Sequence, residues 1–368
     1  MSTKKDKFSL KDQLYMELAL DLAKLREGQT GTNPSVGCVV VKDDEIISIG
    51  QTSFNGRPHA ELNAIKNTAN DLKDSTMYVT LEPCCHHGVT PPCTNAIVKS
   101  KISEVIYSVN DVDNRVKGKT LKILNSKKIK VRKGLLKDKM NQFYIPYFFN
   151  RKKKLPFVTG KIAVGKYSLI YSKNNQKITN SRSDKFTHLL RYKNDSIMIS
   201  YKTLNKDNPK LNCRLKHKEK FSPKRIILDN KLKTNKSSYV FKTAHKDNTI
   251  IFYNEAEKSQ VLKFEKKKIT IIKSKINSNK KFDISIILET LYRLGCRNIL
   301  IEGGNELTKN FLSKRIFNQF YLFKSPKKLS KLTEYKKFKG FSILKKNYKN
   351  RIKINSNFGN NTITLYKK

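Results

Sequence analysis

Hydrophobic and polar positions along the chain predict two consecutive α/β units. An amphipathic helix is expected at residues 12–27, where leucines recur at helical spacing, at positions 14, 18, 22 and 25. A hairpin at 36–50 comes next, and helices then alternate with strands up to a strand that ends near Val131. This β-β-α-β-α-β-α-β order predicts a mixed sheet with helices on both faces.

The second half of the chain restarts the pattern with an apolar strand at 156–164. Helices are expected at 181–192 and 284–295, a polar loop at 201–214, and strands at 196–200, 225–229, 248–253, 269–273 and 298–304. The last strand leads through Gly303 and Gly304 to a helix near Asn305, so a ligand crevice is expected at the carboxyl ends of the strands. A basic run before Pro156 marks the boundary between units 1–150 and 151–368.

Composition limits the classes of protein to which this chain can belong. The apolar runs are too short to cross a bilayer, and the clustered cysteines favour a reduced metal site, so we expect a cytoplasmic protein with no membrane partner. The chain carries 77 Lys and Arg against 30 Asp and Glu, a net charge of +47. Such an excess can indicate nucleic-acid binding. Here the lysines are spread from end to end with abundant Asn and Ile, which AT-rich codons explain equally well, so no specific nucleic-acid partner is expected.

Metal chemistry is indicated by two short segments. A His-Ala-Glu sequence, His59 to Glu61, opens a predicted helix, and "TLEPCCHHGVTPPC" (Thr80–Cys93) follows a predicted strand. A histidine and two thiolates can hold Zn²⁺ and leave the fourth tetrahedral position for water. Zinc deaminases combine this ligand set with a Glu of the His-x-Glu motif that moves protons. Base and tRNA deaminases carry Pro-Cys-x-x-Cys, whereas Cys84 and Cys93 here are separated by eight residues.

Four segments together resemble the bifunctional deaminase and reductase family of riboflavin biosynthesis, RibD: "NPSVGCVVVKD", "PHAE", "TLEPCCHHGVTPPC" and "GGNELTKNFL". The resemblance covers nearly the whole chain. It implies a cytidine-deaminase-like three-layer α/β domain followed by a dihydrofolate-reductase-like domain. The implied reactions are hydrolytic deamination of 2,5-diamino-6-(5-phosphoribosylamino)pyrimidin-4-one and reduction of the ribosyl chain to ribityl by NADPH.

The resemblance also implies the residues of the deaminase site. The zinc ligands would be His59, Cys84 and Cys93, and Glu61 would be the catalytic acid and base. Asn33, His86 and His87 would contact the substrate. Cys85 would be a small residue of the loop.

For the reductase, "KTLNKDNPKLNCR" (Lys202–Arg214) and "ILIEGG" match the family patterns. The substrate contacts implied are Lys161, Arg191, Leu211, Arg214 and Glu302. Arg191 and Arg214 are suited to binding a phosphate, because a guanidinium presents several N–H donors in one plane. The cofactor contacts implied are Val164, Thr203, Asp207, Asn230, Gly303, Gly304 and Asn305.

One departure from the family pattern concerns the reductase half. The segment "KIAVGK" (Lys161–Lys166) is shorter than its family counterpart and lacks the family's Asp, and "NQKIT" (Asn175–Thr179) retains little of the adjoining pattern. An active deaminase with a degenerate reductase is therefore a second hypothesis, and a tRNA-editing deaminase is a third. The sequence leaves open a homo-oligomer and the choice between NADPH and NADH.

Overall fold

The computed structural model describes residues 8–172, 177–267, 269–278, 280–328 and 335–368. The chain forms two compact units, Met1–Lys154 and Leu155–Lys368. The boundary predicted after residue 150 falls inside helix α5 (Lys137–Lys153), because this helix continues through the basic run. Within the described residues, no helix combines the length and the apolar character needed to span a bilayer. The first two residues of the "NQKIT" segment lie outside the described residues.

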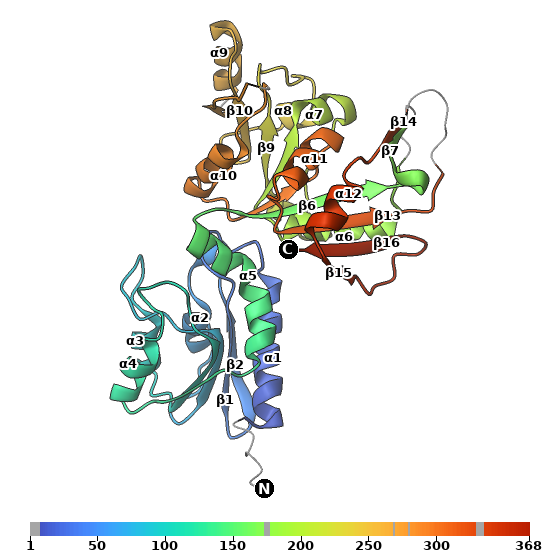
Figure 1. Cartoon of the computed structure of the whole chain (residues 1–368). Helices are drawn as coiled ribbons and strands as arrows, with labels where there is room; N and C mark the ends of the chain where they lie inside the picture. The colour runs from blue at the N-terminus through green and yellow to red at the C-terminus, as the bar shows by residue number, and fades with distance from the viewer. Residues whose placement is uncertain (1–7, 173–176, 268, 279, 329–334) are drawn as a thin grey trace. The chain divides into compact units, whose positions relative to one another are not determined.

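The first unit contains the predicted mixed sheet, in the order β2-β1-β3-β4-β5. Its strands are β1 (Gly37–Lys42), β2 (Glu45–Gln51), β3 (Thr76–Leu81), β4 (Glu104–Val109) and β5 (Lys130–Lys133). β1 pairs antiparallel with β2 and β3, and β3, β4 and β5 run parallel. Its other helices are α1 (Leu10–Leu25), α2 (Ala60–Lys66), α3 (Cys93–Lys99) and α4 (Thr120–Ser126). Figure 1 shows α1 and α5 on one side of the sheet and α2, α3 and α4 on the other, which gives three layers.

Two strand glycines allow helices to lie close to the sheet. A Cβ on Gly37 would lie 1.8 Å from the carbonyl oxygen of Ala19 in α1, and a Cβ on Gly50 would lie 2.1 Å from that of Ala60 in α2. Gly50 pairs with Cys38, the neighbour of Gly37, so the two glycines face opposite sides of the sheet. Any side chain at either position would push its helix away.

The buried face of α1 differs from the leucine stripe in the sequence. Leu14 and Leu25 are exposed, and the buried residues of the helix are Asp12, Met16, Ala19, Leu20 and Ala23. Small alanines face the sheet because the close approach at Gly37 leaves no room for leucine.

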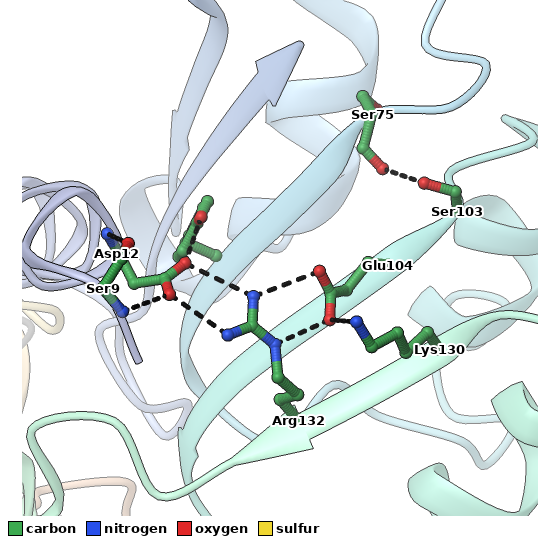
Figure 2. A network of polar contacts seen from close by, with 8 residues as sticks. Ser9, Asp12, Ser75, Ser103, Glu104, Lys130 and Arg132 are labelled. Atoms are coloured by element: carbon green, nitrogen blue, oxygen red, sulfur yellow. Dashed lines mark hydrogen bonds and ion pairs between the residues drawn. The ribbon is translucent and has the colours of Figure 1, made fainter. Parts of the chain in front are cut away.

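A polar network ties the start of α1 to the edge of the sheet (Figure 2). Ser9 and Asp12 form a capping box at the helix start. Arg132 of β5 donates to Asp12 at 3.1 Å and to Glu104 of β4 at 2.7 Å, and Tyr78 of β3 donates to Asp12 at 2.7 Å. Buried Asp12 is therefore satisfied by charge-assisted hydrogen bonds.

The second unit is built on a larger sheet, in the order β11-β10-β9-β8-β12-β6-β13-β16-β15. Its strands are β6 (Phe157–Val164), β8 (Ser196–Ser200), β9 (Lys224–Leu228), β10 (Thr249–Tyr253), β11 (Thr270–Lys273), β12 (Asn298–Ile301), β13 (Gln319–Lys324), β15 (Asn350–Lys353) and β16 (Thr362–Lys367). The strands from β11 to β13 in this order run parallel, so their carboxyl ends share one edge. A separate two-stranded antiparallel sheet pairs β7 (Leu169–Ser172) with β14 (Tyr335–Lys337).

The helices of the second unit are α6 (Ser181–Tyr192), α7 (Tyr201–Asp207), α8 (Tyr239–Lys242), α9 (Lys258–Lys266), α10 (Ile284–Arg293), α11 (Asn305–Ser313) and α12 (Phe341–Asn347). The predicted polar loop at 201–214 is wrong in its first half, where α7 forms. The side chain of Ser200 accepts a hydrogen bond from the backbone N–H of Thr203 and so caps this helix.

Candidate functional site

The two metal motifs converge in the first unit. His59 is the N-cap of α2, Cys93 is the first residue of α3, and Cys84 lies just beyond the end of β3. The Nδ1 of His59 lies 3.3 Å from the Sγ of Cys93 and 3.6 Å from the Sγ of Cys84. All three ligand atoms lie within 4.8 Å of one another. Cys85 lies off this cluster, with its Sγ directed to the carbonyl oxygen of Arg115.

These ligand atoms fit a zinc ion. With Zn–S of about 2.3 Å and Zn–N of about 2.0 Å, tetrahedral angles place a sulfur and a nitrogen ligand roughly 3.5 Å apart. The two observed separations, 3.3 and 3.6 Å, are close to this value. One imidazole and two thiols form the donor set of a catalytic zinc site and leave one position open.

The electrostatics of the cluster suit a cation. A hydrogen bond from the Cys93 thiol lowers the pKa of Cys84, and the same bond raises the pKa of Cys93, so the two thiols hold on to one shared proton. The backbone N–H of Cys93 also donates to the Cys84 sulfur at 3.2 Å. A divalent cation between the thiols would replace that proton, since metal binding deprotonates thiol ligands.

Glu61 lies beside the ligands on the first turn of α2. It is 3% exposed, and this burial raises the pKa of its carboxyl, while the charge of His59 partly offsets the effect. A raised pKa brings a carboxyl group nearer to neutral pH, where it can both accept and release a proton.

The ligand cluster opens into a cleft with a cavity volume of about 210 Å³. Among the residues that line it are Asn33, Arg57, His59, Glu61, Glu82, Cys84, His86, Thr90, Asp111, Arg115, Tyr147 and Arg151. Asn33 donates to the carbonyl oxygen of Gly56 at 2.9 Å. Nδ1 of His86 is buried and has no hydrogen-bond partner among the described residues, so it can bond to a ligand. His87 is exposed and is not part of the cleft lining.

Glu82, which the sequence analysis missed, organises one wall of this cleft. Its buried carboxylate accepts hydrogen bonds from the backbone N–H groups of Asp111 and Gly118, both at 3.1 Å, and of Thr120 at 3.3 Å. It therefore holds the loop that carries the lining residues Asp111 and Arg115. The available signal was an acidic residue at the carboxyl end of a buried strand, directly before Pro-Cys.

Replacing Glu82 with Gln is expected to weaken both the fold and the cleft. The glutamine amide has one acceptor oxygen where the carboxylate has two, so at least one of these hydrogen bonds is lost. A hydrogen bond to a charged group contributes about 1.5–3 kcal/mol. We expect a loss of unfolding free energy in urea denaturation and a higher KM for ammonia release. E104Q is the matched control, because Glu104 binds Arg132 in the network of Figure 2 and does not line the cleft. Equal KM values for the two variants would contradict the role of Glu82.

A second pocket, of about 750 Å³, lies at the carboxyl ends of the parallel strands in the second unit. Seven residues expected from the sequence line it: Lys161, Thr203, Asp207, Glu302, Gly303, Gly304 and Asn305. The predicted crevice is therefore present, and α7 contributes two of the expected residues, Thr203 and Asp207.

The start of α11 fits the phosphates of a dinucleotide. Its N-cap is Gly304, which has no side chain to bond the first N–H groups of the helix. A Cβ on Gly304 would lie 3.3 Å from Oγ1 of Thr203, and a Cβ on Gly303 would lie 3.0 Å from the side chain of Leu307. The two glycines thus keep the backbone accessible, and a helix N-terminus favours an anion.

Other expected reductase residues lie outside the pocket lining. Arg191 is buried and donates to both carboxylate oxygens of Glu302, at 2.7 and 2.9 Å, and to the carbonyl oxygen of Asn212. In this arrangement its guanidinium holds Glu302, which differs from the phosphate contact expected from the sequence. The remaining residues outside the lining are Val164 and Leu211, which are buried, Arg214, which is exposed, and Asn230, which donates to the carbonyl oxygen of Lys280.

Comparison with known proteins gives matches to both units. The family "Cytidine and deoxycytidylate deaminase zinc-binding region" matches residues 9–109, and "RibD C-terminal domain" matches residues 167–358. Riboflavin biosynthesis protein RibD of Aquifex aeolicus is 34% identical over 86% of this chain and 87% of its own. The RibD of Actinobacillus pleuropneumoniae is 32% identical over 87% and 85%. Among solved structures, the chain is similar to a diaminohydroxyphosphoribosylaminopyrimidine deaminase/5-amino-6-(5-phosphoribosylamino)uracil reductase from Thermotoga maritima. The two chains are 29% identical, and the TM-score is 0.81 over 97% of this chain and 98% of that one.

Proposed function

Because the chain belongs to the RibD family and is a bifunctional deaminase and reductase of riboflavin biosynthesis, we propose which of its residues carry each reaction. The substrate we assign to the first unit is 2,5-diamino-6-(5-phosphoribosylamino)pyrimidin-4-one. The observation that carries this assignment is the cluster of His59, Cys84 and Cys93 within 4.8 Å, with buried Glu61 beside it in the cleft.

In the deaminase, His59, Cys84 and Cys93 would hold Zn²⁺. When bound, zinc supplies a Lewis acid that makes hydroxide available from water at neutral pH. The carboxyl of Glu61 would accept a proton from the attacking water and pass it to the amine, which would leave as ammonia while a carbonyl forms on the ring. The raised pKa of Glu61 suits both steps.

Two residues of the cleft are proposed to orient the pyrimidine. Asn33 is fixed by its bond to Gly56, and Nδ1 of His86 offers a hydrogen bond to the ring. Both lie in the same lining as Glu61, so the ring is held with its amine near the carboxyl. His87 stays a prediction from the resemblance alone.

In the reductase, NADPH would be held in the second pocket, where it would supply the hydride for reduction of the ribosyl chain to ribityl. We propose that Gly303, Gly304, Asn305, Thr203 and Asp207 bind this cofactor along the start of α11. Lys161 and Glu302 line the same pocket and would hold the ribosyl chain. The protein thus mainly positions two reactants, as expected when the cofactor carries the chemistry.

We further propose a cytoplasmic enzyme that acts on a small molecule and has no specific nucleic-acid partner. Cys38, Cys84, Cys85, Cys93, Cys213 and Cys296 are all free in the structure. Zinc-binding thiols need a reducing compartment, which the cytoplasm supplies.

Paired assays on one zinc-loaded preparation test this function. Incubation with the diaminopyrimidine substrate should release ammonia. When NADPH is then added, the enzyme should oxidise one NADPH for each ammonia released. Ammonia without NADPH oxidation, in a fully folded protein, would select the hypothesis of a degenerate reductase. Absence of ammonia would contradict the deaminase assignment itself.

A further inference from the structure

Three arginines line the deaminase cleft, and they differ in their partners. Arg115 forms a two-point ion pair with Asp113, with N–O distances of 3.0 and 2.6 Å. Arg151 lies 3.9 Å from the same carboxylate, and its guanidinium lies over the ring of Tyr147, with 5.3 Å to the centroid. Asp113 therefore neutralises one side of the cleft.

Arg57 has no carboxylate partner among the described residues. Its Nη1 donates to the hydroxyl of Thr90, which also lines the cleft. Its Nη2 lies beside Gly88, where an added Cβ would be 3.6 Å from it and 3.8 Å from Nε2 of His86. The guanidinium thus lies along the Gly88–Thr90 segment, and no carboxylate of the described residues pairs with it.

We propose that Arg57, together with Thr90, binds the phosphate of the phosphoribosyl arm while the ring lies at Glu61. This inference rests on the proposed function, since the phosphate belongs to the substrate assigned to the cleft. A guanidinium offers a planar pair of donors that matches two phosphate oxygens. Gly88 has no side chain to cover Arg57, and the Thr90 hydroxyl supplies a further donor. The arm would therefore extend from the zinc ligands toward the Gly88–Thr90 rim.

The test compares ammonia release from the phosphorylated substrate and from the same compound after phosphatase treatment. In R57Q, we expect KM for the phosphorylated substrate to rise on the order of 10- to 100-fold, because bonds to a charged group are lost. KM for the dephosphorylated compound and kcat for both should stay close to wild type. R115Q is the matched control, because Arg115 lines the same cleft but is paired with Asp113, and it should keep the preference for the phosphorylated substrate.

Each outcome decides the proposal. A phosphate-selective loss in R115Q, or an equal rise of KM for both substrates in R57Q, would overturn it. Zinc content and the thermal unfolding temperature verify that R57Q is folded. If R57Q does not fold, R57K is the deciding variant, because lysine keeps the charge but lacks the planar guanidinium. We expect R57K to show an intermediate rise in KM for the phosphorylated substrate only. An unchanged KM in R57K would contradict a role of the guanidinium in phosphate binding. Absence of ammonia in the wild-type protein would instead refute the proposed function.

Discussion

Replacing Cys93 with Ser is expected to abolish ammonia release and to leave NADPH oxidation on the deaminated intermediate unchanged. A serine hydroxyl stays protonated at neutral pH and cannot replace a thiolate in the ligand set. The remaining pair, His59 and Cys84, would then bind zinc weakly. The reductase pocket belongs to the other compact unit, Leu155–Lys368, so its activity should persist. The measurements are zinc content by atomic absorption, ammonia release and NADPH oxidation on the same preparation.

Glu61→Gln is the matched variant for this experiment. It removes the proton carrier but none of the ligands, so we expect zinc to remain bound while ammonia release is lost. Loss of zinc in C93S together with retention in E61Q would separate metal binding from proton transfer. If C93S released ammonia at the wild-type rate, or if both variants also lost NADPH oxidation, the assignment of separate sites would be refuted.

The zinc cluster could be predicted from the sequence because its ligands lie at the junctions of strands and helices. His59 is the N-cap of α2 and Cys93 is the first residue of α3, so both lie where the chain turns from the edge of the sheet into a helix. Cys84 follows β3 at that same edge. Chain geometry and donor chemistry thus converge on these positions, and the resemblance to the family then selected Cys84 and Cys93 among the available thiols.

Features that depend on tertiary packing could not be predicted in this way. The burial of the alanine face of α1 depends on Gly37 in the facing strand, which a helical pattern does not contain. Helix α5 includes Pro146, which argues against a helix, yet Tyr144 anchors it by hydrogen bonds to Thr80 and to the carbonyl oxygen of Ser35. Tertiary contacts override local propensity at both places.

The second prediction with a large effect concerns the ion pair of Arg191 and Glu302 beside the reductase pocket. The side chains of this pair expose 9% and 13% of their surface, and two hydrogen bonds join them. In E302Q, the guanidinium would stay buried without its counter-charge, which costs about 3–5 kcal/mol. We expect urea unfolding at lower concentration and loss of NADPH oxidation, because Glu302 also lines the pocket. Ammonia release, which depends on the first unit, should persist.

The double variant R191M/E302L separates the structural from the catalytic role. Replacement of a buried pair by apolar residues of similar volume is often neutral for stability. The double variant should therefore recover much of the lost stability but not NADPH oxidation. E289Q is the control, since Glu289 and Arg293 form an exposed pair and such pairs contribute about 0–1 kcal/mol. Unfolding of E302Q at the wild-type urea concentration would contradict the importance of the pair.

The pH dependence of stability gives an independent measure of the same pair. Burial alone would raise the pKa of Glu302, but the charge and hydrogen bonds of Arg191 lower it to about 2 from an ordinary value of 4.5. A carboxyl whose pKa is lowered by folding stabilises the fold above its unfolded pKa and loses that contribution as pH falls through the folded value. Wild-type unfolding free energy should therefore fall between about pH 4.5 and 2 by more than that of the R191M/E302L variant. Parallel pH profiles for the two proteins would mean that Arg191 does not hold the carboxylate in its charged form.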